Sequence, residues 1–148
     1  MYIDPAIIVK LLVREPESEW FGRKLAGHDF QVSELALSEV PAALLAKERR
    51  NTISPEERIK STERFFSMIE NEIISLLSLN RQVIDRSRSV QFACHPHVPL
   101  RTLDALHVAT CDLHQVSSMC ATDIRIRAAC QQLGIGLMPG KLEDIASK

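Results

Sequence analysis

Short apolar runs alternate along the chain with segments in which apolar residues recur every three or four positions. Runs of the first kind are typical of buried strands, and segments of the second kind are typical of helices with one buried face. The pattern predicts short strands at residues 1–3, 30–32, 73–79, 116–122 and 135–138. The continuous run IISLLSL at 73–79 indicates a strand that is covered on both faces.

The predicted helices lie between these strands. They cover residues 6–13, 17–26, 38–50, a segment that starts after Ser54, a segment around 83–90, and residues 100–114 and 124–133. Because helices separate the strands, the strands should pair in parallel and form an α/β sandwich. A length of 148 residues favours a single domain over residues 1–148.

Helix boundaries are marked by specific residues. The sequence SPEE at 54–57 places a serine cap before a first-turn proline and a glutamate at the third position, which is the spacing of a capping box. Pro41 is compatible with a helix only near its start, which favours Ser38 as the N-cap of residues 38–50. Gly134 is expected to end the helix at 124–133.

Two of the predicted helices carry an apolar stripe that we expect to be buried. After Ser54 the stripe consists of Ile59, Phe66, Ile69 and Ile73. In residues 100–114 it consists of Leu103, Leu106, Ala109 and Leu113.

The composition is that of an ordinary globular protein, with 45% hydrophobic and 25% charged residues. That balance excludes intrinsic disorder and fibrous repeats. Lys and Arg number 18 against 19 Asp and Glu, so a polyanion would have to be bound by a local basic patch. The four scattered cysteines, with no leader and no membrane-length apolar segment, predict a cytoplasmic protein with reduced thiols.

Four carboxylates fall where a parallel sheet gathers its ligands, outside the carboxyl ends of the strands. Asp4 and Asp123 directly follow apolar runs, whereas Glu39 and Asp104 lie near the starts of helices. Four carboxylates in one pocket would not all stay ionised unaided, and Mg²⁺, which prefers oxygen ligands, resolves this. Such a site would suit hydrolysis of a phosphodiester by a metal-activated water.

Each acid also has a structural explanation. The helix dipole favours a carboxylate near a helix start, and this accounts for Asp104 by itself. Spacing alone does not show that four distant carboxylates converge. Asp85, Asp112 and Asp144 lie on helical faces without such a context and are expected at the surface.

Basic residues near the predicted pocket are candidates for binding substrate phosphates. They are Arg101, Arg125 and Arg127. The cations of the KERR segment at 47–50 are better explained as favourable charges at the C-terminus of a helix.

Two groups of residues invite comparison with a zinc site. They are the CHPH segment at 94–97 and the stripe formed by His107, Cys111 and His114. Neither has the paired spacing of a structural zinc site, and His107 fits better as a hydrogen-bonded histidine of the core. A zinc-stabilised interaction domain is therefore the weakest alternative.

Four blocks in order along the chain resemble the PIN domain family, in particular the VapC-like toxins of bacterial and archaeal toxin–antitoxin pairs. The blocks are MYIDPAIIVKLLVREPE, SELALSEVPAALLAK, LRTLDALHVAT and CATDIRIRAACQQLGI. They place the family's acids at Asp4, Glu39, Asp104 and Asp123.

The resemblance implies a three-layer α/β/α sandwich around a central parallel sheet. It implies an endoribonuclease that depends on Mg²⁺ or Mn²⁺, in which Asp4, Glu39, Asp104 and Asp123 bind the metal and act in catalysis. It further implies an RNA substrate and a homodimer. The expected partner is a small antitoxin that inserts a segment into a groove near the site and blocks it.

Two positions depart from the family pattern. Ala6 stands two positions after Asp4, where a hydroxyl residue is common, and Ala121 stands two positions before Asp123, where a threonine is common. Such hydroxyls orient metal-bound water or carboxylates, and losing them can cost roughly 10–100-fold in metal affinity or activity. The alternative is therefore a catalytically weakened or inactive PIN-fold binding module.

Overall fold

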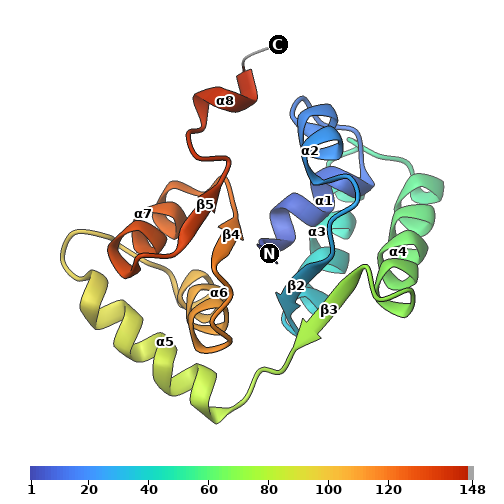
Figure 1. Ribbon diagram of the computed structural model, residues 1–148. Helices are drawn as coiled ribbons and strands as arrows, with labels where there is room; N and C mark the ends of the chain where they lie inside the picture. Colours follow the sequence, from blue (N-terminus) through green and yellow to red (C-terminus); the bar gives the residue numbers. More distant parts are fainter. Residues whose placement is uncertain (147–148) are drawn as a thin grey trace.

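The computed structural model describes residues 1–146, which contain a five-stranded parallel sheet (Figure 1). The strands are β1 (Tyr2–Ile3), β2 (Phe30–Ser33), β3 (Ile74–Leu77), β4 (Ser118–Cys120) and β5 (Gly136–Met138). Their order across the sheet is β3-β2-β1-β4-β5, so β1 is the central strand. All neighbouring strands are parallel, which confirms the predicted pairing.

Helices cover both faces of the sheet. They are α1 (Pro5–Leu12), α2 (Ser18–Leu25), α3 (Ala36–Arg49), α4 (Pro55–Glu70), α5 (Arg81–Cys94), α6 (Thr102–Leu113), α7 (Ile124–Leu133) and α8 (Glu143–Ala146). In Figure 1, α1 to α4 lie to the right of the sheet and α5 to α7 lie to its left. This arrangement is the expected three-layer α/β/α sandwich. No helix in the described part of the chain is long and apolar enough to cross a membrane.

The central strand β1 determines where a ligand can approach the sheet. Tyr2 pairs with Gln31 of β2 and with Met119 of β4, and both Tyr2 and Ile3 are fully buried. The chain passes from β1 to β2 and β3 on one side, and then crosses to β4 and β5 on the other. The strand order therefore reverses between β1 and β4, and sheets of this kind bind ligands outside the carboxyl ends of the strands at such a reversal.

The burial of β3 differs from the prediction. This strand lies at the edge of the sheet and pairs only with β2. Within it Ile74 is buried but Ser75 is exposed, and the preceding Ile73 is 39% exposed. One face of the apolar run is covered, and the other is covered only in part, by the packing of Leu77 against the core. The run does not reveal this, because a short apolar segment can form either an edge strand or a central one.

The predicted buried face of α4 is also wrong. Ile59 and Phe66 are 45% and 40% exposed, whereas Phe65 is fully buried. Ser61 is buried beside α1, and its hydroxyl donates a hydrogen bond to the carbonyl of Leu12. The buried face of α4 therefore contains a serine at its contact with α1. A prediction that considers only apolar residues does not identify such a position.

In α6 the apolar stripe is likewise only partly buried, since Leu103 and Leu113 are 48% and 40% exposed. Small and polar side chains make up most of the face that is actually buried. These residues are Ala105, His107, Val108, Ala109, Thr110 and Cys111. Small side chains allow helices to approach closely, and α6 packs extensively against α5.

α3 begins earlier than predicted. Its first residue is Ala36 and its N-cap position is Leu35, so Ser38 lies inside the helix and is not the cap. Pro41 is also inside the helix. The backbone N–H of Leu35 donates to the hydroxyl of Ser33 at the end of β2. Glu39 still lies in the first turn, as the sequence indicated.

The predicted capping box at the start of α4 is present and should be measurable. Ser54 Oγ accepts from the Glu57 N–H at 3.1 Å, and the Glu57 carboxylate accepts from the Ser54 N–H at 2.8 Å. We expect Ser54→Ala to lower the free energy of unfolding by about 1 kcal/mol, because it removes the Oγ that accepts the Glu57 N–H, while the bond from the Ser54 N–H to the Glu57 carboxylate can remain. Thermal unfolding should show a Tm lower by roughly 2–4 °C. Ser89→Ala, at an exposed site within α5, is the control, and an equal effect of both variants would contradict the assignment.

Candidate active site

Asp4 lies at the reversal point of the sheet, immediately after β1. Its backbone N–H donates to the carbonyl of Cys120 at 2.9 Å, which holds it beside the end of β4. Its carboxylate caps α1 by accepting the N–H of Ala6 at 2.9 Å through Oδ1. The side chain is therefore held at the edge of the sheet, with only 8% of the residue exposed.

The surroundings of Asp4 oppose its ionisation. Burial is the main cause of a raised pKa, because water solvates a carboxylate better than the protein interior does. The N–H of Ala6 partly offsets this effect, while the negative charges of Glu39 and Asp104 raise the pKa further. Asp4 is therefore close enough to both carboxylates to be repelled by them.

Asp104 lies in the first turn of α6 and has an unpaired oxygen. Its Oδ2 atom is buried and has no hydrogen-bond partner. Burial raises the pKa of this carboxyl, and the negative charge of Asp123 raises it further. A buried polar atom without a partner is costly. An ion at this position would remove that cost.

Asp123 is the N-cap of α7. Its Oδ1 accepts the backbone N–H groups of Arg125 at 2.8 Å and Ile126 at 3.2 Å. The guanidinium Nε of Arg125 lies 3.8 Å from the same oxygen. One carboxylate oxygen thus organises the helix start, and Oδ2 takes no part in these contacts.

Glu39 reaches the site from α3. Its Oε2 lies 2.7 Å from Nε2 of His107, which is buried on α6. This contact joins the helix layers on the two faces of the sheet. It confirms that His107 is a hydrogen-bonded histidine of the core.

The four predicted acids therefore lie at the same end of the strands, within electrostatic range of one another as the pairs Asp4–Glu39, Asp4–Asp104 and Asp104–Asp123. Within the described residues, no three His, Cys, Asp or Glu side chains are arranged so as to hold an ion directly. The donor set nevertheless suits Mg²⁺, which keeps several waters and takes few carboxylates. The unpaired Oδ2 of Asp104 is the observation that fits such an ion.

The three predicted phosphate-binding arginines separate in the structure. Arg101 is exposed at the N-cap of α6, and Arg125 lies beside Asp123. Arg127 is buried, and its guanidinium donates to the carbonyls of Ala121, Pro139 and Gly140 at 2.9–3.0 Å. Its predicted role in binding substrate is therefore wrong, because its donors are committed to the backbone that surrounds β5.

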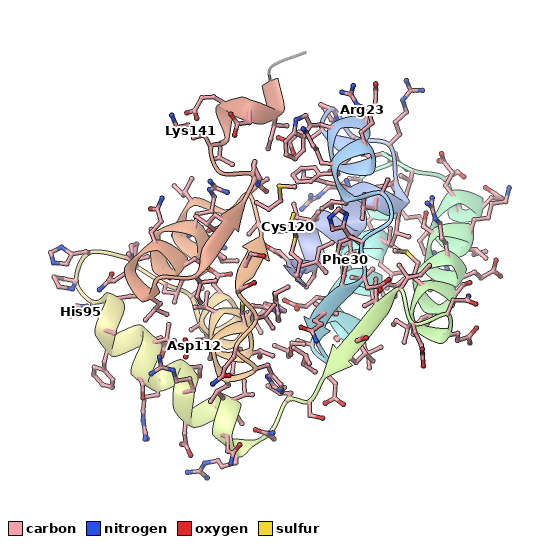
Figure 2. The ribbon with its side chains drawn as sticks, in the orientation of Figure 1. Arg23, Phe30, His95, Asp112, Cys120 and Lys141 are labelled. Atoms are coloured by element: carbon pink, nitrogen blue, oxygen red, sulfur yellow. The ribbon has the colours of Figure 1, made fainter. Side chains whose placement is uncertain are left out.

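The residues of the proposed zinc groups do not converge. Cys94 is buried in the core, whereas His95 and His97 are exposed, and Figure 2 places His95 at the outer end of α5. His114 bonds the carbonyl of Thr110 in its own helix. The thiols of Cys111, Cys120 and Cys130 are buried, and burial raises each pKa to about 12. These cysteines are accordingly protonated packing groups.

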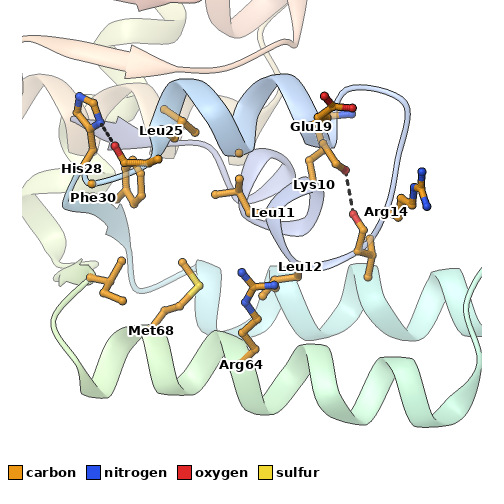
Figure 3. A pocket seen from close by; sticks show the side chains of 16 residues that line it. Lys10, Leu11, Leu12, Arg14, Glu19, Leu25, His28, Phe30, Arg64 and Met68 are labelled. Carbon is orange, nitrogen blue, oxygen red and sulfur yellow. Dashed lines mark hydrogen bonds between the residues drawn. The ribbon is translucent and has the colours of Figure 1, made fainter.

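Two grooves lie at opposite ends of the strands, one at the carboxyl ends and one at the amino ends. A groove of about 680 Å³ runs along α3, and its lining residues are Glu34, Leu35, Leu37, Ser38, Pro41, Ala42, Leu45 and Leu79. A second groove, of about 620 Å³, lies between α1, α2 and α4 (Figure 3). Leu11, Leu12 and Met68 line it together with the cations Lys10 and Arg64. It reaches Phe30 at the start of β2, so it is on the far side from the acids.

Tyr2 is the residue of the site that the sequence did not reveal. Its hydroxyl lies 2.7 Å from Nδ1 of His107 and accepts the N–H of Ser33 at 3.1 Å. In the sequence it is one residue of a short apolar run, and nothing there indicates its partners. The only available signal was a hydroxyl-bearing aromatic residue in a strand that directly precedes a candidate acid.

Comparison with known proteins agrees with this architecture. The model of the PIN domain family matches residues 1–131. Ribonuclease VapC46 of Mycobacterium tuberculosis (strain ATCC 25618 / H37Rv) is 34% identical over 141 residues, which cover 93% of this chain and 95% of that protein. A toxin–antitoxin complex from Klebsiella pneumoniae contains a chain of the same fold, with a TM-score of 0.60 at 13% identity, covering 88% of this chain and 92% of that one. The chain therefore belongs to the PIN domain family and is one of its VapC-like members.

Proposed function

We propose that the chain is a metal-dependent endoribonuclease and the toxin of a toxin–antitoxin pair. The observation that carries the proposal is the meeting of Asp4, Glu39, Asp104 and Asp123 at the reversal point of the sheet. The mycobacterial relative supports it, because that protein is named a ribonuclease and is similar over nearly its whole length.

The carboxylates would divide their oxygens between the fold and the ion. Asp4 and Asp123 cap helices through Oδ1, which leaves Oδ2 available to an ion, and Asp104 offers its unpaired Oδ2. Glu39 completes the set through Oε1, because Oε2 faces His107. When bound, Mg²⁺ or Mn²⁺ activates a water and stabilises charge on the phosphoryl oxygens.

RNA would be held through its backbone phosphates by Arg101 and Arg125. These two cations lie at the starts of the helices that carry Asp104 and follow Asp123. The chain as a whole has a net charge of −1, so binding depends on such local cations.

The groove along α3 is where an antitoxin segment would dock. Its lining includes Ser38, the residue before Glu39 on α3, so an occupant would lie at the same end of the strands as the acids, whereas the groove in Figure 3 is at the opposite end. Leu37 and Leu45 in its wall are 39% and 45% exposed, which would favour an apolar segment.

A catalytically weakened or inactive binding module is the second candidate, and two alanines favour it. Ala6 contributes only its backbone N–H to Asp4, and the buried Ala121 contributes only its carbonyl to Arg127. Neither supplies a hydroxyl that could orient water at the site. Homodimer formation and a cytoplasmic location stay predictions.

Asp104→Asn should abolish RNA cleavage, because it removes the charge of the acid with the unpaired oxygen. The loss should exceed the roughly 10–100-fold that substitutions outside the ligand set cost. Cleavage of RNA with Mg²⁺ or Mn²⁺, and with EDTA as the metal-free reference, measures this. Asp85→Asn, which removes a charge that pairs with Arg81 and Arg88 on α5, is the matched control. Equal activity of the wild type and Asp104→Asn would refute the assignment, and absence of Mn²⁺ uptake by calorimetry would favour the binding module.

The same variant should make the metal-free protein more stable. The folded-state pKa of Asp104 lies above its ordinary value of 3.8, so the folded protein holds this proton more tightly than the unfolded chain and loses stability as pH rises through that range. Asp104→Asn removes this loss. After allowance for solvent screening, the gain near neutral pH should be about 1 kcal/mol or less, or up to about 3 °C in Tm. Thermal unfolding should show a smaller gain at pH 4 than at pH 7.5, and the reverse order would contradict this explanation.

Leu45→Glu should weaken capture of the antitoxin, because it places a charge in the apolar wall of the α3 groove. Co-purification with a co-expressed candidate antitoxin measures it. Ile59→Glu is a matched control, since Ile59 on α4 is exposed to the same extent, 45%. If Leu45→Glu changes only the oligomeric state and leaves antitoxin capture intact, the groove is a self-association surface and this part of the proposal is wrong.

A further inference from the structure

A continuous chain of hydrogen bonds connects the centre of the sheet to Glu39. The backbone N–H of Ser33 donates to the Tyr2 hydroxyl oxygen at 3.1 Å. That hydroxyl lies 2.7 Å from Nδ1 of His107, and Nε2 of His107 lies 2.7 Å from Oε2 of Glu39. Tyr2 and Ser33 are fully buried and His107 is 3% exposed, so these three groups are shielded from water, whereas the Glu39 side chain is 26% exposed.

The protons of this chain can be assigned by counting donors and acceptors. The Tyr2 oxygen already accepts one hydrogen bond from a backbone N–H, and its own proton needs an acceptor. The only acceptor that faces it among the contacts of this hydroxyl is Nδ1 of His107. His107 must then carry its proton on Nε2, which donates to the Glu39 carboxylate. Every polar group is paired in this arrangement.

The opposite tautomer leaves two groups unsatisfied. With the proton on Nδ1 of His107, the Tyr2 proton has no acceptor, although the side chain is fully buried. The lone pair of Nε2 would also face the oxygen of Glu39 at 2.7 Å, an acceptor against an acceptor. Burial raises the pKa of Tyr2, so its hydroxyl keeps its proton and can act as the donor.

The geometry points to His107 as a positioning residue that fixes Glu39 in one orientation, with Tyr2 fixing the tautomer of His107. Oε2 of Glu39 is held by Nε2–H, so Oε1 is the oxygen that is presented to the ion. The role of Glu39 in this inference rests on the proposed function. The tautomer of His107 follows from the hydrogen bonds alone and can be tested without measuring any activity. Donation by a neighbouring group to the second oxygen or nitrogen of a ligand is a general way of orienting it.

The tautomer can be measured on the metal-free protein. Long-range ¹H–¹⁵N NMR correlations distinguish a protonated Nε2 from a protonated Nδ1 in a neutral histidine. We expect His107 to show the Nε2–H form in the wild type and in Glu39→Ala, where the Tyr2 hydroxyl alone still selects it. The double variant Tyr2→Phe/Glu39→Ala, which lacks both groups that select this form, should give a mixture of both forms while the fold is retained. His114, which bonds a backbone carbonyl at the end of α6, is the internal reference and should be unchanged. An Nδ1–H form in the wild type, or a Glu39→Ala pattern that is unchanged when Tyr2→Phe is added, would overturn the inference.

Two near-isosteric variants separate positioning from packing. The amide nitrogen of His107→Gln reaches the place of Nε2 and can still donate to Glu39, whereas that of His107→Asn reaches only the place of Nδ1. We expect His107→Asn to lower kcat by about 10- to 100-fold with an unchanged KM for RNA, and His107→Gln to recover most of it. Mn²⁺ affinity measured by calorimetry should follow the same order. His114→Gln should behave as the wild type.

The outcomes distinguish the two proposals. If the wild type shows the Nε2–H form but neither cleaves RNA nor takes up Mn²⁺, the proposed function is wrong and the hydrogen-bond chain stands as a structural feature alone. If the wild type cleaves RNA but His107→Gln and His107→Asn are equally impaired at the same Tm, His107 does not act through its bond to Glu39 and the positioning role is refuted.

Discussion

The central physical constraint on this molecule is the cost of keeping carboxylates ionised at a partly buried edge of a sheet. Burial and mutual repulsion both raise the pKa of Asp4 and Asp104. A fold selected for stability alone would separate these charges or pair them with cations. This one instead brings them to the reversal between β1 and β4, a place that parallel sheets use for ligands. Carboxylates whose pKa is raised by burial and by neighbouring charge are typical of functional sites.

The surrounding elements limit that cost without neutralising the acids. Helix starts supply backbone N–H groups to Asp4 and Asp123, and Arg125 lies close to the latter. Glu39 receives its support from His107, across the sheet from its own helix. These donors orient each carboxylate as well as stabilising it. The strands, the helix caps and the Tyr2 hydroxyl therefore contribute to one site, although they are distant in sequence.

The sequence was sufficient for the order of elements and for the positions of the acids, because both depend on local signals. Residues 124–133 form α7 as predicted, and Gly134 ends it in a left-handed conformation with φ of 73°. The buried faces of α4 and α6 were not predictable, since Ser61 and the small residues of α6 make contacts that depend on neighbouring helices. Arg127 and His107 show the same limit: their partners are carbonyls and a carboxylate that only the folded chain brings near.

Helix capping by Asp4 and Asp123 has an evolutionary consequence. Each uses Oδ1 to begin the next helix, and asparagine caps a helix through the same oxygen about as well as aspartate. Exchange of either acid for its amide would remove a negative charge from the candidate site while the fold persists. Selection that acts only on folding would not remove such a change, because the helix caps are kept. Duplicated copies of this chain that acquire either exchange would keep the fold and the surface grooves but lack the complete set of four carboxylates.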